Sequence, residues 1–508
     1  MILDKYGKPY QTESASGGWN TRRWDAADTD RLNQAHWQKA SGLDINTDLV
    51  TRLPELRKRI AYELGNNPLL RGMLQTHKTD LVGAHGPQLN ITALTAKEET
   101  VDDYAKALEQ VWDEWWADPC LNQDLSGVDL LRQHIEMLWQ CGEFLTQFVT
   151  DQTVNGPIKT RLHPLHPGRI GAESWGVAYT LTGTRDVVMG IERNKTGKAM
   201  FYHLDETPPG MLFMAGNQRR LAARNIMHEF RRDEPGQIRG LPWIASGLQA
   251  IADLRDFDLQ VLDAARQAAD SGIILSATGA DVTPLIVNEE VDVPRRRVTM
   301  APPGWVPHQM QANQPAANYV EYRRERHRDL GRMVSMPSMI ARMDSSQHNF
   351  SSARFDAQSY DRSNEEIAAW LTRCCMNKLV TMVEDEASKA GAIPKERPAR
   401  VQAEWAWGAR THRAGDPQKE AGAAKQRMDS KLTTLGDELA LMGKDLETHL
   451  KRLQREAKLM KDAGLLPEGG NSEEGSLDRA ISNLFYRAIE EFHSRHAPEE
   501  KPAMQEAV

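Results

Sequence analysis

Apolar and polar positions between residues 242 and 272 repeat with the period of one long helix that has three different faces. One face is apolar, a second mixes leucine and isoleucine with arginine, and the third carries aspartate and glutamine without a cation. The apolar face comprises Ala250, Leu254, Phe257, Val261, Ala264 and Ala268. The mixed face comprises Leu248, Ile251, Leu259, Leu262, Arg255 and Arg266. The acidic stripe comprises Asp253, Asp256, Gln260, Asp263, Gln267 and Asp270.

Residue types at both ends of this segment fit a helix. Pro242 suits the first turn, and Gly272 can adopt the left-handed conformation that ends a helix. Two faces that can pack and one acidic edge fit a helix that stands between two neighbours and turns its third side to water. A helix inside one domain with an acidic solvated face explains the same pattern. The helix alone does not decide between these interpretations.

The chain before this helix predicts an α+β domain with an antiparallel sheet. Residues 1–50 are polar and read as an arm without a core of its own. A helical pattern from Leu49 to Leu81 is interrupted near Pro68, and a short strand begins at Pro87. Two further helices follow Thr100 and Ser126, and tryptophans at helical spacing in the first of them indicate core. Strand patterns dominate residues 143–230.

The chain after this helix predicts a projection made of helix, small β-rich tip and helix. Residues 273–312 combine short β-patterns, several prolines and the basic triplet Arg295, Arg296 and Arg297. A second helix, rich in charge of both signs, is predicted for residues 316–335. After it the sequence predicts a polar loop, a long helix from Ser352 to about residue 390, a short strand at 405–407, a helical region at 416–464 and a final helix at 476–493.

Length and composition limit the class of protein. A chain of 508 residues is too long for one core, and 40% hydrophobic with 26% charged residues is typical of globular proteins. We expect no membrane span and no secretion signal, because no apolar run is long enough. Four cysteines make no disulfide framework, which fits synthesis in a reducing cytoplasm. A net charge of −8 argues against general coating of nucleic acid, so contact with DNA has to be local.

Signatures of enzymes are missing from the sequence. The Gly190 to Lys198 segment has the wrong spacing for a phosphate-binding loop, and His228-Glu229 lacks the second histidine of a zinc peptidase helix. His163 and His166 lie in a proline-rich segment without a nearby cysteine or carboxylate, which favours a plain loop over a metal site. We therefore expect no catalytic residue, no metal and no cofactor.

Five stretches, in this order along residues 65–465, resemble the lambda-type portal proteins of tailed bacteriophages. They are Asn66-Asn67-Pro68 with the following Leu81 to Leu89, His228 to Pro242, Ala301 to Gly304, Asn349 to Arg354, and Asp416 to Glu420. Each stretch alone is weakly specific, and their shared order carries the resemblance. Residues after 466 are not covered by it.

The resemblance implies a portal fold in a ring of twelve identical subunits at one vertex of the procapsid. Its expected parts are an N-terminal arm (1–50), an α+β wing (51–241), a first stem helix (242–272), a β-rich clip (273–312) and a second stem helix (313–335). The remaining parts are a channel loop (336–352), a long helix with wing completion and a helical crown (353–466), and a C-terminal linker, helix and tail (467–508).

The resemblance also implies partners. Double-stranded DNA would pass through the axial channel, and the ring would contact the terminase large subunit, the major capsid protein and head–tail connector proteins. The protein would assemble in the host cytoplasm and remain in the virion. Two rival interpretations are a different head–tail adaptor ring component and a hydrolase with an undetected site on the α+β domain.

Three groups of residues are expected to act in such a ring. The acidic stripe would line the channel and oppose adhesion of DNA phosphates. Arg342, His348 and Asn349 would contact DNA from the channel loop, although a loop ordered only by subunit contacts is an equal alternative. The triplet Arg295–Arg297 would dock a partner at the clip, or it is a solvated turn. Ser351, Ser352 and Arg354 read as a helix cap and an ion pair between subunits.

Overall fold

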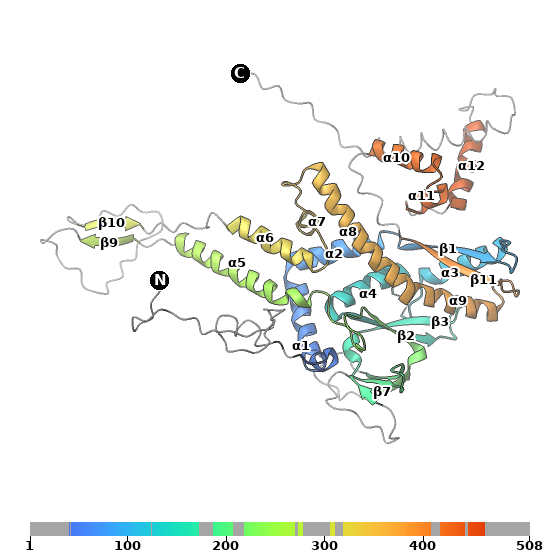
Figure 1. The fold of residues 1–508 in the computed structure, drawn as a ribbon, viewed down its shortest axis with the longest axis horizontal. Coiled ribbons are helices and arrows are strands. Elements are labelled where there is room, and N and C mark those ends of the chain that lie inside the picture. The colour runs from blue at the N-terminus through green and yellow to red at the C-terminus, as the bar shows by residue number, and fades with distance from the viewer. Residues whose placement is uncertain are drawn as a thin grey trace, which may run out of the picture. The chain divides into compact units, whose positions relative to one another are not determined.

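The computed structural model describes residues 40, 42–122, 124–171, 186–206, 218–269, 273–277, 305–309, 319–407, 417–441 and 446–462. The chain divides into two compact units, residues 1–48 and 49–508. Helices and exclusively antiparallel strand pairs make up the described part, so the predicted α+β class is confirmed (Figure 1). Most of the predicted arm, Asp270, the triplet Arg295–Arg297 and the predicted helix at 476–493 lie outside the described residues.

Four helices precede or flank the first strands, and local sequence fixes their ends. They are α1 (Ile45–Asn66), α2 (Pro68–Val82), α3 (Asp102–Ala117) and α4 (Gly127–Cys141). The predicted break near Pro68 is confirmed, because the Asn67 side chain accepts hydrogen bonds from the N–H groups of Leu69 and Leu70 and so caps α2. Ser126 caps α4 in the same way through the Asp129 N–H.

The described strands form four small antiparallel sheets. The central one places β2 (Glu143–Thr150) between β3 (Thr160–Leu165) and β8 (Ile226–Phe230). A second orders β4 (Asp186–Val188), β5 (Ile191–Arg193), β6 (Ala199–Asp205) and β7 (Gln218–Ala222). The third pairs β1 (Pro87–Leu94) with β11 (Arg400–Trp407), in register from Pro87 opposite Trp407 to Leu94 opposite Arg400.

The middle of the chain is a helical hairpin with a β-ribbon between its helices, as predicted. It consists of α5 (Leu248–Ala269), β9 (Ile273–Ala277), β10 (Trp305–Gln309) and α6 (Tyr319–Arg332). The first helix begins later than the Pro242 predicted for it, because the Trp243 N–H donates to the carbonyl of Leu138 and a short turn, η4 (Ala245–Gly247), intervenes.

The C-terminal part is helical around β11. It comprises α7 (Ser338–Arg342), α8 (Phe350–Leu371), a π-helical turn (Thr372–Met376), α9 (Asn377–Ala390), α10 (Pro417–Asp429), α11 (Leu435–Leu441) and α12 (Leu446–Asp462). The long helix predicted from Ser352 to about residue 390 is present as α8, the π turn and α9, and it starts two residues earlier, at Phe350.

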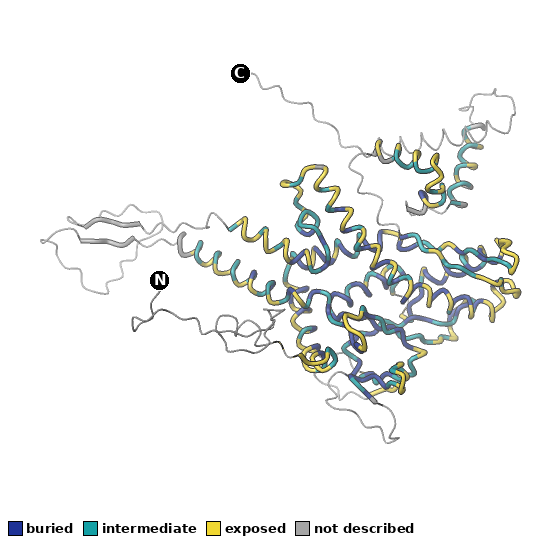
Figure 2. The backbone as a smooth tube through the Cα atoms, in the orientation of Figure 1, coloured by how far each residue is buried: buried dark blue, intermediate teal, exposed yellow. Residues whose placement is uncertain are grey.

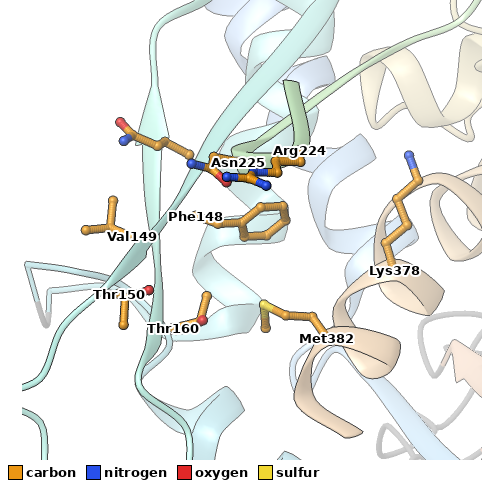
Figure 3. Close-up of a pocket in the computed structure, with 9 residues that line it drawn as sticks. Phe148, Val149, Thr150, Thr160, Arg224, Asn225, Lys378 and Met382 are labelled. Carbon is orange, nitrogen blue, oxygen red and sulfur yellow. The ribbon is translucent and has the colours of Figure 1, made fainter. Parts of the chain in front are cut away.

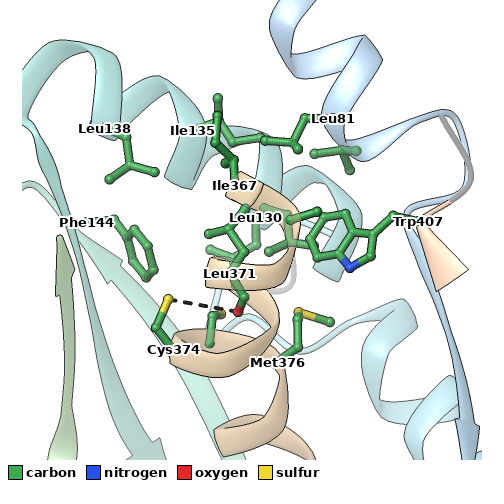
Figure 4. Close-up of a cluster of buried hydrophobic side chains, with 14 of the residues drawn as sticks. Leu81, Leu130, Ile135, Leu138, Phe144, Ile367, Leu371, Cys374, Met376 and Trp407 are labelled. Carbon is green, nitrogen blue, oxygen red and sulfur yellow. Dashed lines mark hydrogen bonds between the residues drawn. The ribbon is translucent and has the colours of Figure 1, made fainter. Parts of the chain in front are cut away.

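The core forms where α4 and β2 meet the α8–α9 junction. Leu130, Leu138, Phe144 and Leu371 are each fully buried there, and Figure 4 shows their side chains converging. Trp112, Trp115 and Trp116 of α3 belong to the same apolar cluster, so their predicted core role is confirmed. Burial of a leucine or phenylalanine side chain such as those of this core contributes roughly 2 kcal/mol to the free energy of unfolding.

One buried carboxylate joins the sheet to the segment that leads into α5. Glu143 of β2 accepts hydrogen bonds from Arg239 and from Arg57 of α1, each at 2.6 Å, and from the Gly240 N–H at 2.8 Å. The two arginines bond at 2.6 Å to Oε1, whereas the Gly240 N–H bonds to Oε2 and the His228 Nε2 of β8 lies 3.0 Å from that same Oε2. Burial alone would raise the pKa of Glu143, but Arg239, Arg57 and His228 hold it well below the ordinary value, so the group is ionised.

Two glycines allow this segment to approach the sheet. A Cβ on Gly142, which has φ +78°, would lie 2.1 Å from the backbone of Leu241, and a Cβ on Gly240 would lie 2.1 Å from the carbonyl oxygen of Gly142. No side chain fits at either position. The path of the chain into α5 is therefore set by a backbone contact and by the Glu143 ion pairs.

Truncation of a core leucine should lower stability strongly. Leu371 is fully buried, so we expect Leu371→Ala to reduce the free energy of unfolding by about 2–5 kcal/mol through lost contacts and a new cavity. Chemical denaturation measures this difference. The matched control is Leu459→Ala on α12, where the side chain is exposed and the change should stay within about 0.5 kcal/mol. Equal effects of the two substitutions would contradict the described core.

The buried imidazole of His77 should make stability depend on pH. Burial lowers the pKa of His77 from 6.5 to about 4, and the Trp139 Nε1–H donates to its Nδ1 at 2.9 Å. The unfolded chain therefore binds a proton between pH about 6.5 and 4 that the folded chain does not. The neutral imidazole therefore stabilises the folded chain fully above pH about 6.5. We expect the free energy of unfolding to decrease by about 3 kcal/mol as the pH falls from there to about 4.

Denaturation at several pH values tests this with His77→Gln as the comparison. The free energy of unfolding of the variant should change less between pH about 6.5 and 4 than that of the parent chain, because all other titrating groups are shared. Identical pH profiles would show that His77 does not titrate in this way.

Candidate functional site

Helices α5 and α6 pack along the predicted apolar face of α5. The Phe257 ring lies 6.0 Å from Tyr319 and 4.8 Å from Tyr322 between centroids. The Tyr319 hydroxyl donates to Asp258 at 2.9 Å, and Arg323 pairs with the same carboxylate at 3.3 Å. These contacts join the middle of α5 to the start of α6, whereas Gly247, just before α5, lies against Met333, just after α6, so the helices run antiparallel (Figure 1).

The base of the hairpin is closely packed. A Cβ on Gly247 would lie 1.9 Å from the sulfur of Met333, and Ile251, Leu254 and Leu330 are buried beside this crossing. Gly331 makes a second close approach, because an added Cβ would lie 2.5 Å from the carbonyl oxygen of Met336. The base is thus fixed in position, whereas the rest of both helices is mostly intermediate or exposed (Figure 2).

The structure brings the acidic stripe together on one exposed edge of α5. Asp253, Asp256, Gln260 and Asp263 are all exposed. Gln267 lies on the last turn of α5, but its side chain is not among those described, and Asp270 lies outside the described residues.

Neighbouring residues partly satisfy the charges of this edge. The Arg266 guanidinium donates to Asp263 at 3.0 Å, the Arg255 Nε lies 3.8 Å from Asp256, and the Gln249 amide donates to Asp253 at 2.8 Å. Four aspartates and two arginines in α5 face five arginines and three acidic residues in α6, so the two helices together carry no net charge. The field at this edge is therefore weaker than the stripe alone predicts.

The mixed face of α5 carries exposed apolar side chains. Leu259 is 53% exposed and Leu262 is 46% exposed, and α6 exposes Val320 and Tyr322. Arg255, from the same face, bonds instead to the buried Glu63 of α1. Within the part of the chain that the structure describes, nothing covers the two leucines, so this face is free to pack against another molecule.

The predicted DNA-contact residues of the loop each have a partner within the subunit. Arg342 pairs with Asp344 at 3.0 Å, and the His348 Nε2 lies 3.7 Å from Asp356. The Asn349 side chain accepts from the Ser352 N–H at 2.8 Å, and the Ser352 hydroxyl completes a capping box at the start of α8. A cap is present where Ser351 and Ser352 predict one, but the capping residue is Asn349, and Ser352 completes the capping box from the third helical position. No contact joins these three side chains into one cluster among the described residues.

The loop region exposes apolar side chains that the sequence analysis did not single out. Met343 is 81% exposed with φ +51°, a conformation that costs a residue with a side chain about 1 kcal/mol, and Phe355 is 70% exposed. No local sequence signal marks Met343, because left-handed C-caps ordinarily carry glycine. Nearby, burial and the cations Arg323 and Arg342 lower the pKa of His327 to about 4, so this imidazole is neutral at physiological pH.

Among the described residues, no three His, Cys, Asp or Glu side chains are grouped as metal ligands. None of the described helices is both long enough and apolar enough to span a membrane. The loop predicted around His163 is wrong, because His163 lies on strand β3 opposite Gln147; burial and the cations Arg169 and Arg219 lower its pKa.

Comparison with known proteins places the chain in a family. The family described as phage portal protein, lambda family, matches residues 30–367, about two thirds of the chain. A probable portal protein of Halomonas phage phiHAP-1 is 22% identical over 266 residues, which are 49% of this chain and 48% of the relative. The match thus spans about half of the relative's length.

Two solved structures show a distant likeness. The neck of an empty gene transfer agent particle matches with 11% identity and a TM-score of 0.42, over 79% of this chain and 94% of that one. An HK97-family phage portal protein from Corynebacterium diphtheriae matches with 12% identity and a TM-score of 0.30, over 70% of this chain and 98% of that one. On the family match across residues 30–367, the chain belongs to the lambda family of phage portal proteins.

Proposed function

We propose that the protein forms a closed ring, with twelve subunits expected, at the portal vertex of a phage head, and that double-stranded DNA passes through its channel during packaging and ejection. The observation that carries this proposal is the α5–α6 hairpin, which presents exposed leucines on one edge and exposed carboxylates on another. In this assignment residues 51–241 are the wing, α5 and α6 are the stem, and residues 273–312 are the clip.

The leucine edge supports ring formation. A face with Leu259 and Leu262 half exposed leaves apolar area in water that a second copy can cover. Val320 of α6 is 57% exposed, whereas Tyr322, two positions further on, points to another side of the helix and packs against Phe257. We infer that Val320 belongs to the surface that covers the leucines of the next subunit. An interface between two different surfaces of identical subunits is heterologous, and such interfaces close into rings when the rotation permits.

The acidic edge supports passage of DNA without adhesion. Asp253, Asp256 and Asp263 are exposed, and the nearby arginines Arg255 and Arg266 are engaged by carboxylates. A surface without free cations offers DNA no gain from counterion release, so the duplex can slide. Twelve copies would place about three dozen of these carboxylates around the channel, where low ion access strengthens their field.

The remaining partners follow from the same assignment. We infer that the clip docks the terminase large subunit and later the head–tail connector proteins, with Arg295–Arg297 as a candidate contact, and that the ring meets the major capsid protein at the vertex. The loop at residues 336–352 would face the channel. Because Arg342, His348 and Asn349 are engaged within the subunit, contact with DNA would need them to exchange partners. The protein would assemble in the host cytoplasm, reside in the virion and act without catalysis.

Replacing the leucines should prevent ring closure. We expect Leu259→Asp with Leu262→Asp to leave the subunit folded but monomeric, because the substitutions place charges in the proposed contact. Mass photometry and negative-stain imaging measure the assembly, and circular dichroism checks the fold. Leu432→Asp, at a leucine that is exposed between α10 and α11, is the matched control and should still form rings. Rings from the double variant would contradict this interface.

Reversing the acidic edge should slow packaging without affecting assembly. Asp256→Lys with Asp263→Lys places cations where DNA would pass, so we expect a packaging rate lower by about threefold or more, with greater slowing at low salt. Glu55→Lys is the matched control, since Glu55 is also exposed and bonds to an arginine of its own helix at 2.8 Å. An unchanged packaging rate in intact rings would show that this edge does not line the channel. It would not contradict the proposal that the protein forms a ring.

A further inference from the structure

A groove of about 490 Å³ lies between the end of β2 and helix α9, outside the α5–α6 hairpin (Figure 3). Strand β2, the start of β3, the short turn η3 (Ala223–Asn225) and α9 supply its walls. The lining residues are Gln147, Phe148, Val149, Thr150, Thr160, Arg224, Asn225, Lys378 and Met382.

The floor of the groove is apolar and half open. Phe148 of β2 and Met382 of α9 pack against the hydrophobic core from its edge, and both remain partly accessible. Figure 3 shows the Phe148 ring and the Met382 thioether on the same side of the groove. An aromatic ring beside a flexible thioether can accept an apolar side chain of varied shape.

The rim of the groove is cationic. Arg224 and Lys378 are among the lining residues, and no carboxylate is. Glu229 pairs with Lys378 and so offsets the charge of that lysine, and Glu386 accepts the backbone N–H groups of Lys159 and Thr160 at 2.8 and 3.2 Å. Arg224 is exposed and has no carboxylate partner within the described part of the chain. The groove is therefore suited to a negatively charged occupant.

One side of β2 is open where it forms the wall of the groove. Strand β3 pairs with β2 as far as Thr150, but β8 pairs with it only from Glu143 to Gln147, where Ile226 is the last partner. Among the described residues, Phe148 to Thr150 thus have a strand on one side only. A strand edge beside an apolar floor is the arrangement in which an extended peptide adds to a sheet.

We propose that this groove binds an extended acidic segment of a partner protein. The segment lies along β2 at Phe148–Thr150, places one apolar side chain between Phe148 and Met382, and directs a carboxylate to Arg224. A DNA backbone fits these observations less well, since it offers phosphates for the rim but no apolar side chain for the floor.

Binding of a model peptide to the full-length protein tests the proposal. The probe is a fluorescein-labelled peptide of sequence Glu-Asp-Glu-Leu-Glu-Asp, followed by fluorescence anisotropy. We expect Arg224→Glu to weaken binding by about tenfold or more, because it replaces attraction by repulsion at the rim. Met382→Gln, which keeps the size of the side chain but makes it polar, should weaken binding severalfold. Lys389→Glu, also an exposed cation of α9 but outside the groove, should have little effect.

Two further probes decide between this occupant and others. A peptide with serine in place of leucine should bind clearly more weakly, and equal binding would exclude the apolar anchor. A duplex of about 30 base pairs should not displace the acidic peptide, and displacement that Arg224→Glu abolishes would identify a phosphate site instead. Unchanged peptide binding by Arg224→Glu would place the peptide elsewhere. Ring formation, measured on the same samples, is an independent outcome, because neither leucine of the proposed ring contact lines the groove.

Discussion

The arrangement of the described structure depends on the ionised carboxylate of Glu143, which has no access to solvent. Its two oxygens are shared by Arg57 of α1, Arg239, His228 of β8 and the Gly240 N–H. A buried ion pair adds little net stability, but removal of one partner leaves an uncompensated charge that costs several kcal/mol. The network therefore acts as a constraint on geometry: it holds the sheet, α1 and the entry to α5 in a single arrangement, and the direction of the hairpin follows from it.

The local features of the chain were predictable, because they depend on residues close in sequence. The three faces of α5, the caps at Asn67 and Ser126 and the helix–ribbon–helix order all follow from periodicity and from residue types at helix ends. Contacts between distant segments were not predictable. Nothing in the sequence around Glu143 indicates that Arg57 and Arg239, separated by nearly two hundred positions, would meet it, and β1 finds its partner β11 across an even longer separation.

The candidate site shows the same division between what was and was not predictable. Periodicity placed Asp253, Asp256 and Asp263 on one edge, but it did not show that arginines from an adjacent face reach back to two of them. The rotamer of a long side chain determines which partner its charged end reaches, and sequence spacing alone does not determine the rotamer. For the channel that we propose, the consequence is an edge whose negative charge is partly neutralised, so that it would neither bind DNA tightly nor repel it strongly.

The π-helical turn at Thr372–Met376 sets the phase between α8 and α9. It inserts one residue relative to a regular helix, which rotates everything after it by about 100°. With this offset, Leu371 on one side and Glu384 on the other both face the interior, where Glu384 accepts from the Tyr104 hydroxyl and from Arg397. Loss of a single residue from this turn would make the helix regular and rotate α9 about its axis, so that Lys378 and Met382 would no longer face β2.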